Sequence, residues 1–289
     1  MTDYAISNSE VLTWSTCQKK WDYEHKQRLA PKHVSDALSR GILFHELMEV
    51  LYNTLMETNM HWPTAEANAV GLLDQMVQDS LELNRDDMPL MLELRTLLVE
   101  YCDYAKDNQN WEIFGVEMKC GGEYGTTPVA GRLDLLIRFL DGPHKGKICI
   151  VDHKTSYRMW SENDQYQQGQ MFKYAQWLND EHGMDITLGA YNFILYRAKQ
   201  DKFQLKVIDL PKKKQLQVHD DHIAYAKQIQ SARVSTEPLP RSWNKQVCGM
   251  CNFKELCNAE VGGETNASKR LKEFDFKANE YGYQLGSAQ

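Results

Sequence analysis

The ten residues from Lys147 to Ser156, KICIVDHKTS, constrain the fold more strongly than any other stretch of this sequence. The apolar run at 148–151 has the composition of a strand buried in a sheet. Because a strand has a period of two, Asp152 and Lys154 share the face that carries the even-numbered apolar residues. An acid and a base therefore lie side by side at the end of a core strand, where burying charge is costly.

Helical and strand-like patterns follow one another in an order that predicts the architecture. Helical spacing of apolar residues covers 35–57, 63–83 and 89–107, and a helix is expected at 163–181 and another at 212–232. Strand patterns cover 111–119, 127–140, 147–154, 188–197 and 202–210. This order predicts an α/β fold with a mixed central sheet flanked by helices, with a helical lobe inserted at about 46–108. We expect a single domain over residues 1–262 and a polar C-terminal tail over 263–289.

Charge is distributed unevenly along the 289 residues, whose net charge is −7. Residues 46–107 contain 13 acidic and three basic residues, which is a net charge of −10, so the rest of the chain carries about +3. The segments 19–40 and 197–214 are locally basic. Such segments either follow a phosphate backbone or simply form a solvated face.

No apolar segment approaches the ~20 residues of a membrane span, and no N-terminal stretch joins a basic region to an apolar run. A cytoplasmic protein that does not bind membranes is therefore expected. Seven cysteines are an odd number, which argues against a full disulfide framework. Reduced thiols leave metal binding as an open hypothesis.

The carboxylate of Asp134 raises a second question about buried charge. Its strand, GRLDLLIRF, surrounds it with leucine and isoleucine, so it needs a partner or a cation. On one interpretation, Asp134 or Asp152 forms a structural ion pair with Lys154. On the other, the two carboxylates converge on Mg²⁺ or Mn²⁺ and the lysine acts beside them. The spacing leaves both interpretations open.

Two helical patterns add candidate residues. GILFHELMEVLY places His45 on an otherwise apolar helix, where it is either a core residue or a ligand. QMFKYAQWL places Gln170 and Tyr174 four residues apart, and therefore on one face of the helix that follows the Asp152 strand.

Three cysteines within ten residues form a metal-binding pattern. CGMCNFKELC contains Cys248, Cys251 and Cys257 with C-x2-C-x5-C spacing. A fourth ligand is needed, and Cys17, in STCQKKWDY, is the candidate. Zinc and an iron–sulfur cluster both accept four thiolates. Cys102, Cys120 and Cys149 lie in helix or strand patterns and are expected to be core thiols.

Six motifs in this order resemble a known family: SNSEVLTWSTCQKKWDYE, GILFHELME, AGRLDLLI, IVDHKTS, QMFKY and CGMCNFKELC. The set resembles the RecB-like branch of the PD-(D/E)XK nucleases, and within it the iron–sulfur members such as the AddB nuclease domain and the CRISPR-adaptation nucleases. The likeness runs from about Ser7 to Cys257. It implies a restriction-endonuclease-like fold in which an iron–sulfur cluster joins the N- and C-terminal segments.

The resemblance implies a role for each matching residue. His45, Asp134 and Asp152 would bind the catalytic Mg²⁺ or Mn²⁺ with the backbone carbonyl of His153, and Lys154 would be the catalytic lysine. Gln170 and Tyr174 match the family's Q-x3-Y motif beside the active site. The [4Fe-4S] ligands would be Cys17, Cys248, Cys251 and Cys257. If that cluster fixes its neighbours in place, the adjacent basic residues Lys19, Lys20 and Arg28 are candidates for binding DNA.

Two departures from the family are visible. Gln18 follows Cys17 where the family often has proline, and Asp152 stands where many members have glutamate. The chain has no G-x4-G-K-S/T motif, so we expect a nuclease module without a helicase motor.

The function that the resemblance implies is a metal-dependent DNA exonuclease acting on single-stranded ends. Its partners would be proteins of recombination, replication or CRISPR adaptation, and its size suits a phage-encoded protein. A different hypothesis is a DNA-binding accessory module that keeps the nuclease fold for recognition. A third keeps the nuclease and assigns zinc to the cysteines.

Overall fold

The computed structural model describes residues 5–31, 36–82, 87–263 and 274–276. The chain forms two compact units. The first, built from residues 1–34, 121–131 and 217–289, is called the cysteine unit because it contains Cys17 and Cys248. The second, built from residues 35–120 and 132–216, is called the sheet unit. The single domain expected over residues 1–262 stays a prediction.

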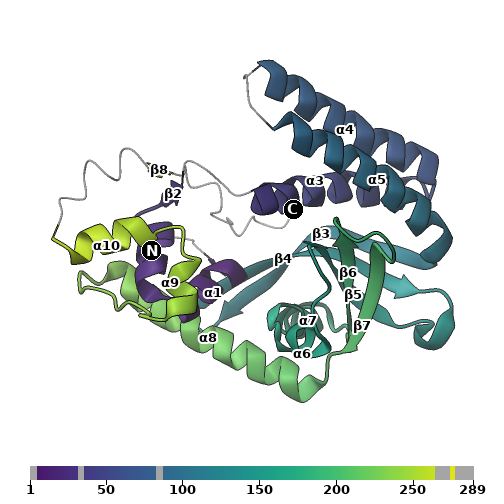
Figure 1. Cartoon of the computed structure of the whole chain (residues 1–289). Coiled ribbons are helices and arrows are strands. Elements are labelled where there is room, and N and C mark those ends of the chain that lie inside the picture. Colours follow the sequence, from purple (N-terminus) through teal and green to yellow (C-terminus); the bar gives the residue numbers. More distant parts are fainter. Residues whose placement is uncertain (1–4, 32–35, 83–86, 264–273, 277–289) are drawn as a thin grey trace. The chain divides into compact units, whose positions relative to one another are not determined.

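A mixed sheet forms the centre of the sheet unit (Figure 1). Five of its six strands are β3 (Trp111–Tyr124), β4 (Thr127–Phe139), β5 (Ile148–Ser156), β6 (Leu188–Leu195) and β7 (Phe203–Asp209), of which β3 and β4 continue into the cysteine unit. The sixth strand, β1 (Ile6–Ser7), belongs to the cysteine unit. β5 pairs antiparallel with β4 and parallel with β6, while β7 pairs antiparallel with β6 and β3 pairs with β4. The predicted mixed sheet is therefore confirmed. A short 3-10 helix, η2 (Gly142–His144), lies in the turn between β4 and β5.

Three long helices cover one face of this sheet. They are α3 (Asp36–Glu57), α4 (Trp62–Glu82) and α5 (Met88–Asn108), and they pack against one another (Figure 1). Their buried side chains, such as Phe44 and Leu51, share a core with Cys149 and Val151 of β5. The helical spacing read from the sequence predicts all three helices to within two residues at each end. Their apolar faces thus bury the odd-numbered side of β5.

After β5, the chain forms two helices where the sequence predicts one. α6 (Glu162–Gln167) begins with a capping box between Ser161 and Asp164, and α7 (Gln170–His182) follows it. The expected helix at 163–181 is therefore wrong in its continuity. Gln168 has an extended backbone, with φ −67° and ψ 114°, and Gly169, a poor helix former, caps α7. This break places Gln170 in the first turn of α7.

A buried polar network ties α3 and α5 to the sheet. The Tyr101 hydroxyl lies 2.5 Å from the Tyr52 hydroxyl and accepts hydrogen bonds from Gln109 at 2.8 Å and Asn192 at 2.6 Å. The Asn192 amide nitrogen also lies 2.9 Å from His153 Nδ1, and the His153 ring stacks on Tyr52 with centroids 5.2 Å apart. Buried polar groups of this kind fix geometry because each loses its partner if the elements shift.

The cysteine unit is built from short elements around a small core. Near its N-terminus it has β1 (Ile6–Ser7), α1 (Asn8–Thr16), α2 (Gln18–Trp21), the π-helix η1 (Asp22–Lys26) and β2 (Leu29–Pro31). The C-terminal part has α8 (Lys212–Val234), which begins in the sheet unit, α9 (Lys245–Gly249), α10 (Lys254–Val261) and β8 (Phe274–Phe276). β1 pairs parallel with β4 at Val129 and Ala130, and β2 pairs antiparallel with β8.

The expected tail at 263–289 lies mostly outside the described residues. Within it, the structure describes Gly263 and strand β8, which the sequence patterns did not predict. Pairing with β2 thus holds part of the presumed tail in the cysteine unit.

Tyr101→Phe should destabilise the protein because it removes the hydroxyl that three neighbours share. Buried donors left without an acceptor cost about 1–3 kcal/mol, so we expect a loss of that size in the free energy of unfolding, measured with urea. Tyr104→Phe is the matched control. Its ring packs on Phe203 with centroids 5.4 Å apart, and a change within about 0.5 kcal/mol is expected. Equal losses in both variants would contradict a structural role for the network.

Candidate active site

Three side chains from three elements of the sheet unit converge on one point. His45 comes from α3, Glu117 from β3 and Asp134 from β4, and their ligand atoms all lie within 4.8 Å of one another. His45 Nδ1 lies 3.5 Å from Asp134 Oδ2. Among the described residues, no other three histidine, cysteine, aspartate or glutamate side chains meet this spacing. Two of these three residues, His45 and Asp134, are predicted from the sequence as metal ligands.

Asp134 is held against a second carboxylate. Leu135 pairs with Val151 in the antiparallel register, and continuing that register places Asp134 opposite Asp152. Burial and the nearby Asp152 raise the pKa of Asp134 to about 6, although His45 and Lys154 oppose the rise. The backbone N–H of His153 donates a hydrogen bond of 2.7 Å to Asp134 Oδ2. The electrostatic strain between the two acids is only partly relieved by the protein itself.

Asp152 and Lys154 share one face of β5, as the strand period predicts. Lys154 Nζ lies 2.6 Å from Asp152 Oδ2, and Gln170 donates a hydrogen bond of 3.2 Å to Asp152 Oδ1. Burial alone would lower the pKa of Lys154, but Asp152 and Asp134 outweigh it and raise that pKa. The ion pair of the structural interpretation is therefore present, and it lies next to the converging ligand set.

The other two predicted site residues are Tyr174 and His153, and they have different surroundings. Tyr174, one helical turn after Gln170, is buried and forms a hydrogen bond to the backbone of Arg132. Burial, the largest cause, raises the pKa of the Tyr174 phenol well above its usual value. The His153 side chain belongs to the polar network on the opposite face, and burial lowers its pKa so that the imidazole is neutral. Metal coordination by its carbonyl stays a prediction.

Glu117 is the one member of the convergent set that sequence analysis missed. It has a positive φ of 49° within β3, and the buried positions Trp111, Gly115 and Cys120 show that the alternation of faces shifts by one residue around it. From a regular period of two, the Glu117 carboxylate is therefore not expected to lie beside Asp134. The available signal was an acid followed by an apolar residue in the middle of a strand pattern, WEIFGVEMK.

Arg132 only partly balances the negative charge of Glu117. Burial and Asp134 raise the pKa of Glu117 to about 7, while Arg132 lowers it. Arg132 Nε lies 2.5 Å from Glu117 Oε2, and a second nitrogen of Arg132 lies 2.9 Å from Glu49 Oε1. Arg132 thus holds Glu117 in position while dividing its own charge between two acids.

The donor set fits a hard divalent cation. Mg²⁺ and Mn²⁺ prefer carboxylate oxygens and accept an imidazole, and both retain waters when few protein ligands are available. Here one imidazole and two carboxylates converge, and Asp152 adds a third carboxylate across the strand pair. A bound cation would also relieve the repulsion that raises the pKa of Asp134. The residues present are therefore able to bind such a metal.

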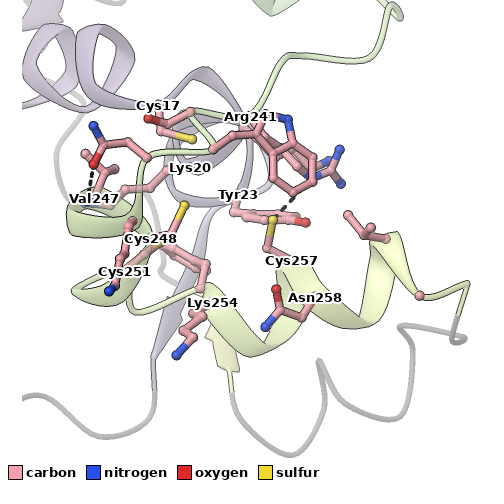
Figure 2. A pocket seen from close by; sticks show the side chains of 18 residues that line it. Cys17, Lys20, Tyr23, Arg241, Val247, Cys248, Cys251, Lys254, Cys257 and Asn258 are labelled. Carbon is pink, nitrogen blue, oxygen red and sulfur yellow. Dashed lines mark hydrogen bonds between the residues drawn. The ribbon is translucent and has the colours of Figure 1, made fainter.

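The four predicted cluster cysteines line one cavity of about 460 Å³ in the cysteine unit (Figure 2). Cys17 lies between α1 and α2, Cys248 in α9, Cys251 in the following turn and Cys257 in α10. Five cationic side chains and no carboxylate line the same cavity: Lys19, Lys20, Arg241, Lys245 and Lys254. The remaining three cysteines, Cys102, Cys120 and Cys149, are buried in the sheet unit, as predicted.

The three residues predicted to bind DNA differ in their surroundings. Lys19 lies 3.0 Å from Asp22 and 3.2 Å from Glu260, and Lys20 lies 3.8 Å from Glu24. Arg28 is exposed and has a positive φ of 56°. Two of the three charges are therefore shared with acids of the same unit, and DNA binding by any of them stays a prediction.

Comparison with known proteins identifies the family. The model of the PD-(D/E)XK nuclease superfamily matches residues 5–258. A crystal structure of a protein named "Putative exonuclease" from Eubacterium rectale aligns with a TM-score of 0.52 and 13% identity over 88% of each chain, which shows a shared fold. The structure of SSO0001 aligns with a TM-score of 0.37 and 15% identity over 90% of this chain and 88% of that one, too distant to support an argument.

No curated protein matches this sequence. In the part of the chain that the structure describes, no helix is long and apolar enough to cross a membrane. The family match spans most of the 289 residues and includes every residue of the convergent site. The chain therefore belongs to the PD-(D/E)XK nuclease superfamily.

Proposed function

We propose that this protein is a metal-dependent DNA exonuclease that hydrolyses phosphodiester bonds from single-stranded ends. The observation that carries the proposal is the pair of facing carboxylates, Asp134 and Asp152, with Lys154 2.6 Å from one of them and His45 3.5 Å from the other. A DNA-binding accessory module would have no use for this arrangement of acids, imidazole and lysine.

The metal ligands of this proposal are His45, Asp134 and Asp152, with the carbonyl of His153 and, from the structure, the carboxylate of Glu117. When bound, Mg²⁺ or Mn²⁺ would lower the pKa of a water ligand and neutralise charge on the phosphate. Asp134 is oriented by the N–H of His153, and Asp152 by Gln170. These hydrogen bonds hold the two acids at fixed separation on adjacent strands.

Lys154 acts on the phosphate side of the site in this mechanism. Water attacks phosphorus and loses a proton to solvent, the bond to the leaving oxygen breaks, and that oxygen takes up a proton from solvent. Negative charge builds up on the phosphate oxygens during this step. The Lys154 ammonium, half-buried beside Asp152, is positioned to stabilise that charge and to orient the attacking water. Tyr174 acts indirectly, because its bond to the Arg132 backbone anchors α7, which carries Gln170.

Three considerations support exonuclease action on single-stranded DNA. Superfamily membership supports DNA as the substrate. The Eubacterium rectale protein that shares the fold is named an exonuclease, although 13% identity does not transfer its activity. The preference for single-stranded ends rests on the likeness of the six motifs to RecB-like enzymes.

We also propose that the cavity of the cysteine unit binds a structural [4Fe-4S] cluster through Cys17, Cys248, Cys251 and Cys257. A zinc ion with bonds of about 2.3 Å would bring its sulfurs within about 4 Å of one another. Here no three of the sulfurs lie within 4.8 Å. A cavity of about 460 Å³ also exceeds the space for one ion. Of the five cations that line it, Lys19, Lys20 and Arg241 are paired with acids, and Lys245 and Lys254 remain to offset the charge of a thiolate-bound cluster.

The core around these cysteines is small. Tyr23, Leu29, Phe253 and Leu256 form the buried cluster, with Cys251 and Cys257 packed against it. Small cores of this kind commonly need a metal or a disulfide for stability. Loss of the cluster is therefore expected to loosen α9 and α10.

Lys154→Ala should reduce DNA cleavage by about 100-fold or more, because removing one preorganised charge from such a site has effects of about 10²–10³ in rate. End-labelled single- and double-stranded DNA with Mg²⁺ or Mn²⁺ is the assay, and circular dichroism checks the fold. Lys145→Ala, an exposed lysine before β5, is the control and should cut like the parent. A folded Lys154→Ala variant with parental rates would remove this lysine from the mechanism.

Glu117→Gln should weaken the binding of the catalytic metal while leaving the polypeptide folded. A carboxylate-to-amide change removes one negative ligand, and we expect the Mn²⁺ concentration for half-maximal cleavage to rise about 10-fold or more. Mn²⁺ binding measured by paramagnetic resonance gives the same quantity without turnover. Glu112→Gln is the control, because Glu112 lies on the same strand and pairs with Arg138 at 3.2 Å. Identical metal dependence in both variants would exclude Glu117 as a ligand.

Protein purified without oxygen should be brown, absorb near ~400 nm and contain about four irons per chain, as expected of a thiolate-bound [4Fe-4S] cluster. Cys248→Ser should lose colour and iron and should lower the melting temperature. Cys102→Ala, which changes a buried thiol of the sheet unit, should keep the colour and the iron. A colourless, folded and zinc-loaded parent would instead support the zinc hypothesis.

A further inference from the structure

Two parallel strands of the sheet unit end at the same edge, immediately beyond Lys154. Ser156 of β5 pairs with Leu195 of β6, so both strands stop in register. The next residues are Tyr157 and Arg158 after β5, and Tyr196 and Arg197 after β6. Binding sites in sheets of this kind form beyond the carboxyl ends of parallel strands. We call Tyr157, Tyr196 and Arg197 the aromatic–arginine edge.

The planar groups of this edge lie against one another. The Arg197 guanidinium lies 5.4 Å from the centre of the Tyr157 ring and 6.0 Å from that of Tyr196. Arg40 covers the Tyr196 ring at 4.3 Å. The side chains thus form a layered surface of alternating cations and aromatic rings, and each arginine restricts the motion of the ring beside it.

The two arginines in this layer differ in how their charge is balanced. Arg40 is neutralised by Glu93, whose two oxygens accept hydrogen bonds of 2.9 and 2.8 Å. No carboxylate pairs with Arg197 among the described residues, and its side chain is exposed. Tyr157 is 61% exposed, a high value for a large aromatic residue. The edge therefore presents an uncompensated cation next to an open aromatic surface.

The edge begins three residues after the proposed catalytic lysine in the chain. Tyr157 follows Lys154 by three residues, which is about 10 Å along an extended chain or roughly three stacked base steps. Lys154 Nζ also lies 5.9 Å from the ring of Trp160, which packs on Tyr191 and Phe193 of the sheet. A nucleic acid strand that reaches Lys154 can therefore also reach Tyr157.

We propose that the aromatic–arginine edge binds the single-stranded end of the nucleic acid substrate, with a base stacked on Tyr157 and a phosphate paired with Arg197. This inference rests on the proposed nuclease function and assigns its substrate contact. Exposed aromatic rings bind unstacked bases of any sequence, and an unpaired arginine binds the adjoining phosphate. Duplex bases already stack on their neighbours, so the site selects a single strand.

The test measures binding of a fluorescein-labelled 12-nucleotide oligothymidylate to the full chain, with EDTA present to prevent cleavage. Tyr157→Ala should raise Kd about 5- to 100-fold, since a base–aromatic stack has effects of that size. Tyr157→Phe keeps the ring and should bind like the parent. Arg197→Gln should make the negative slope of log K against log salt shallower by about 0.7, the contribution of one phosphate on a single strand.

A matched cation–aromatic pair at the other end of β5 supplies the control. Arg138 lies 4.4 Å from the Phe114 ring and is opposite Ile148, the first residue of β5. Phe114 is 39% exposed, and Glu112 balances the arginine. Phe114→Ala should leave oligonucleotide binding at the parental value.

The outcomes separate this inference from the nuclease proposal. With Mg²⁺, Tyr157→Ala should raise KM for single-stranded DNA with kcat changed by less than about twofold, because a binding contact is lost and not a catalytic one. If the parent cuts DNA but Tyr157→Ala binds oligothymidylate as tightly as the parent, the edge is rejected and the nuclease stands. An equal loss with a 12-base-pair duplex would also reject single-strand stacking. A parent that binds through Tyr157 without cutting would keep the edge and reject the nuclease, and one that does neither would refute both.

Discussion

The repulsion between Asp134 and Asp152 is the constraint around which the sheet unit is organised. The two acids occupy facing positions on adjacent antiparallel strands, in surroundings from which water is largely removed. Four groups contact the two acids and offset part of this repulsion. They are the Lys154 ammonium, the His45 imidazole, the Gln170 amide and the backbone N–H of His153. These partners reduce the electrostatic cost without cancelling it, and burial together with Asp152 still raises the pKa of Asp134. A divalent cation bound between these carboxylates would reduce the remaining repulsion.

The polar network on the His153 face of β5 explains how His45 is held at this site. His45 and Tyr52 lie two turns apart on α3, and Tyr52 is fixed to β5 and β6 through His153, Tyr101 and Asn192. The helix is therefore anchored to the sheet by a network of neutral groups while it holds His45, whose ring lies 6.2 Å from the His153 ring, beside Asp134. Because the His153 imidazole is neutral, the network adds no charge beside the two acids.

Much of this arrangement could be predicted from the sequence, and the failures have local physical causes. Asp134, Asp152 and Lys154 were recognisable because charge stood among apolar strand residues, and α3 to α5 because apolar residues kept a helical period over many turns. The break at Gly169 was missed because the helical pattern continues across it, although the backbone of Gln168 does not. Glu117 was missed because its position depends on a shift of alternation that only the burial pattern and backbone of the folded strand make visible.

The left-handed backbone of Glu117 has a consequence for how β3 tolerates changes in length. The alternation of faces is offset by one residue between Gly115 and Cys120, and the side chain that turns toward Asp134 lies within that offset. Deleting a single residue there would restore a regular strand of ordinary hydrophobicity. The same deletion would turn the carboxylate to the other side of the sheet, so β3 accepts substitutions far more readily than a change of register.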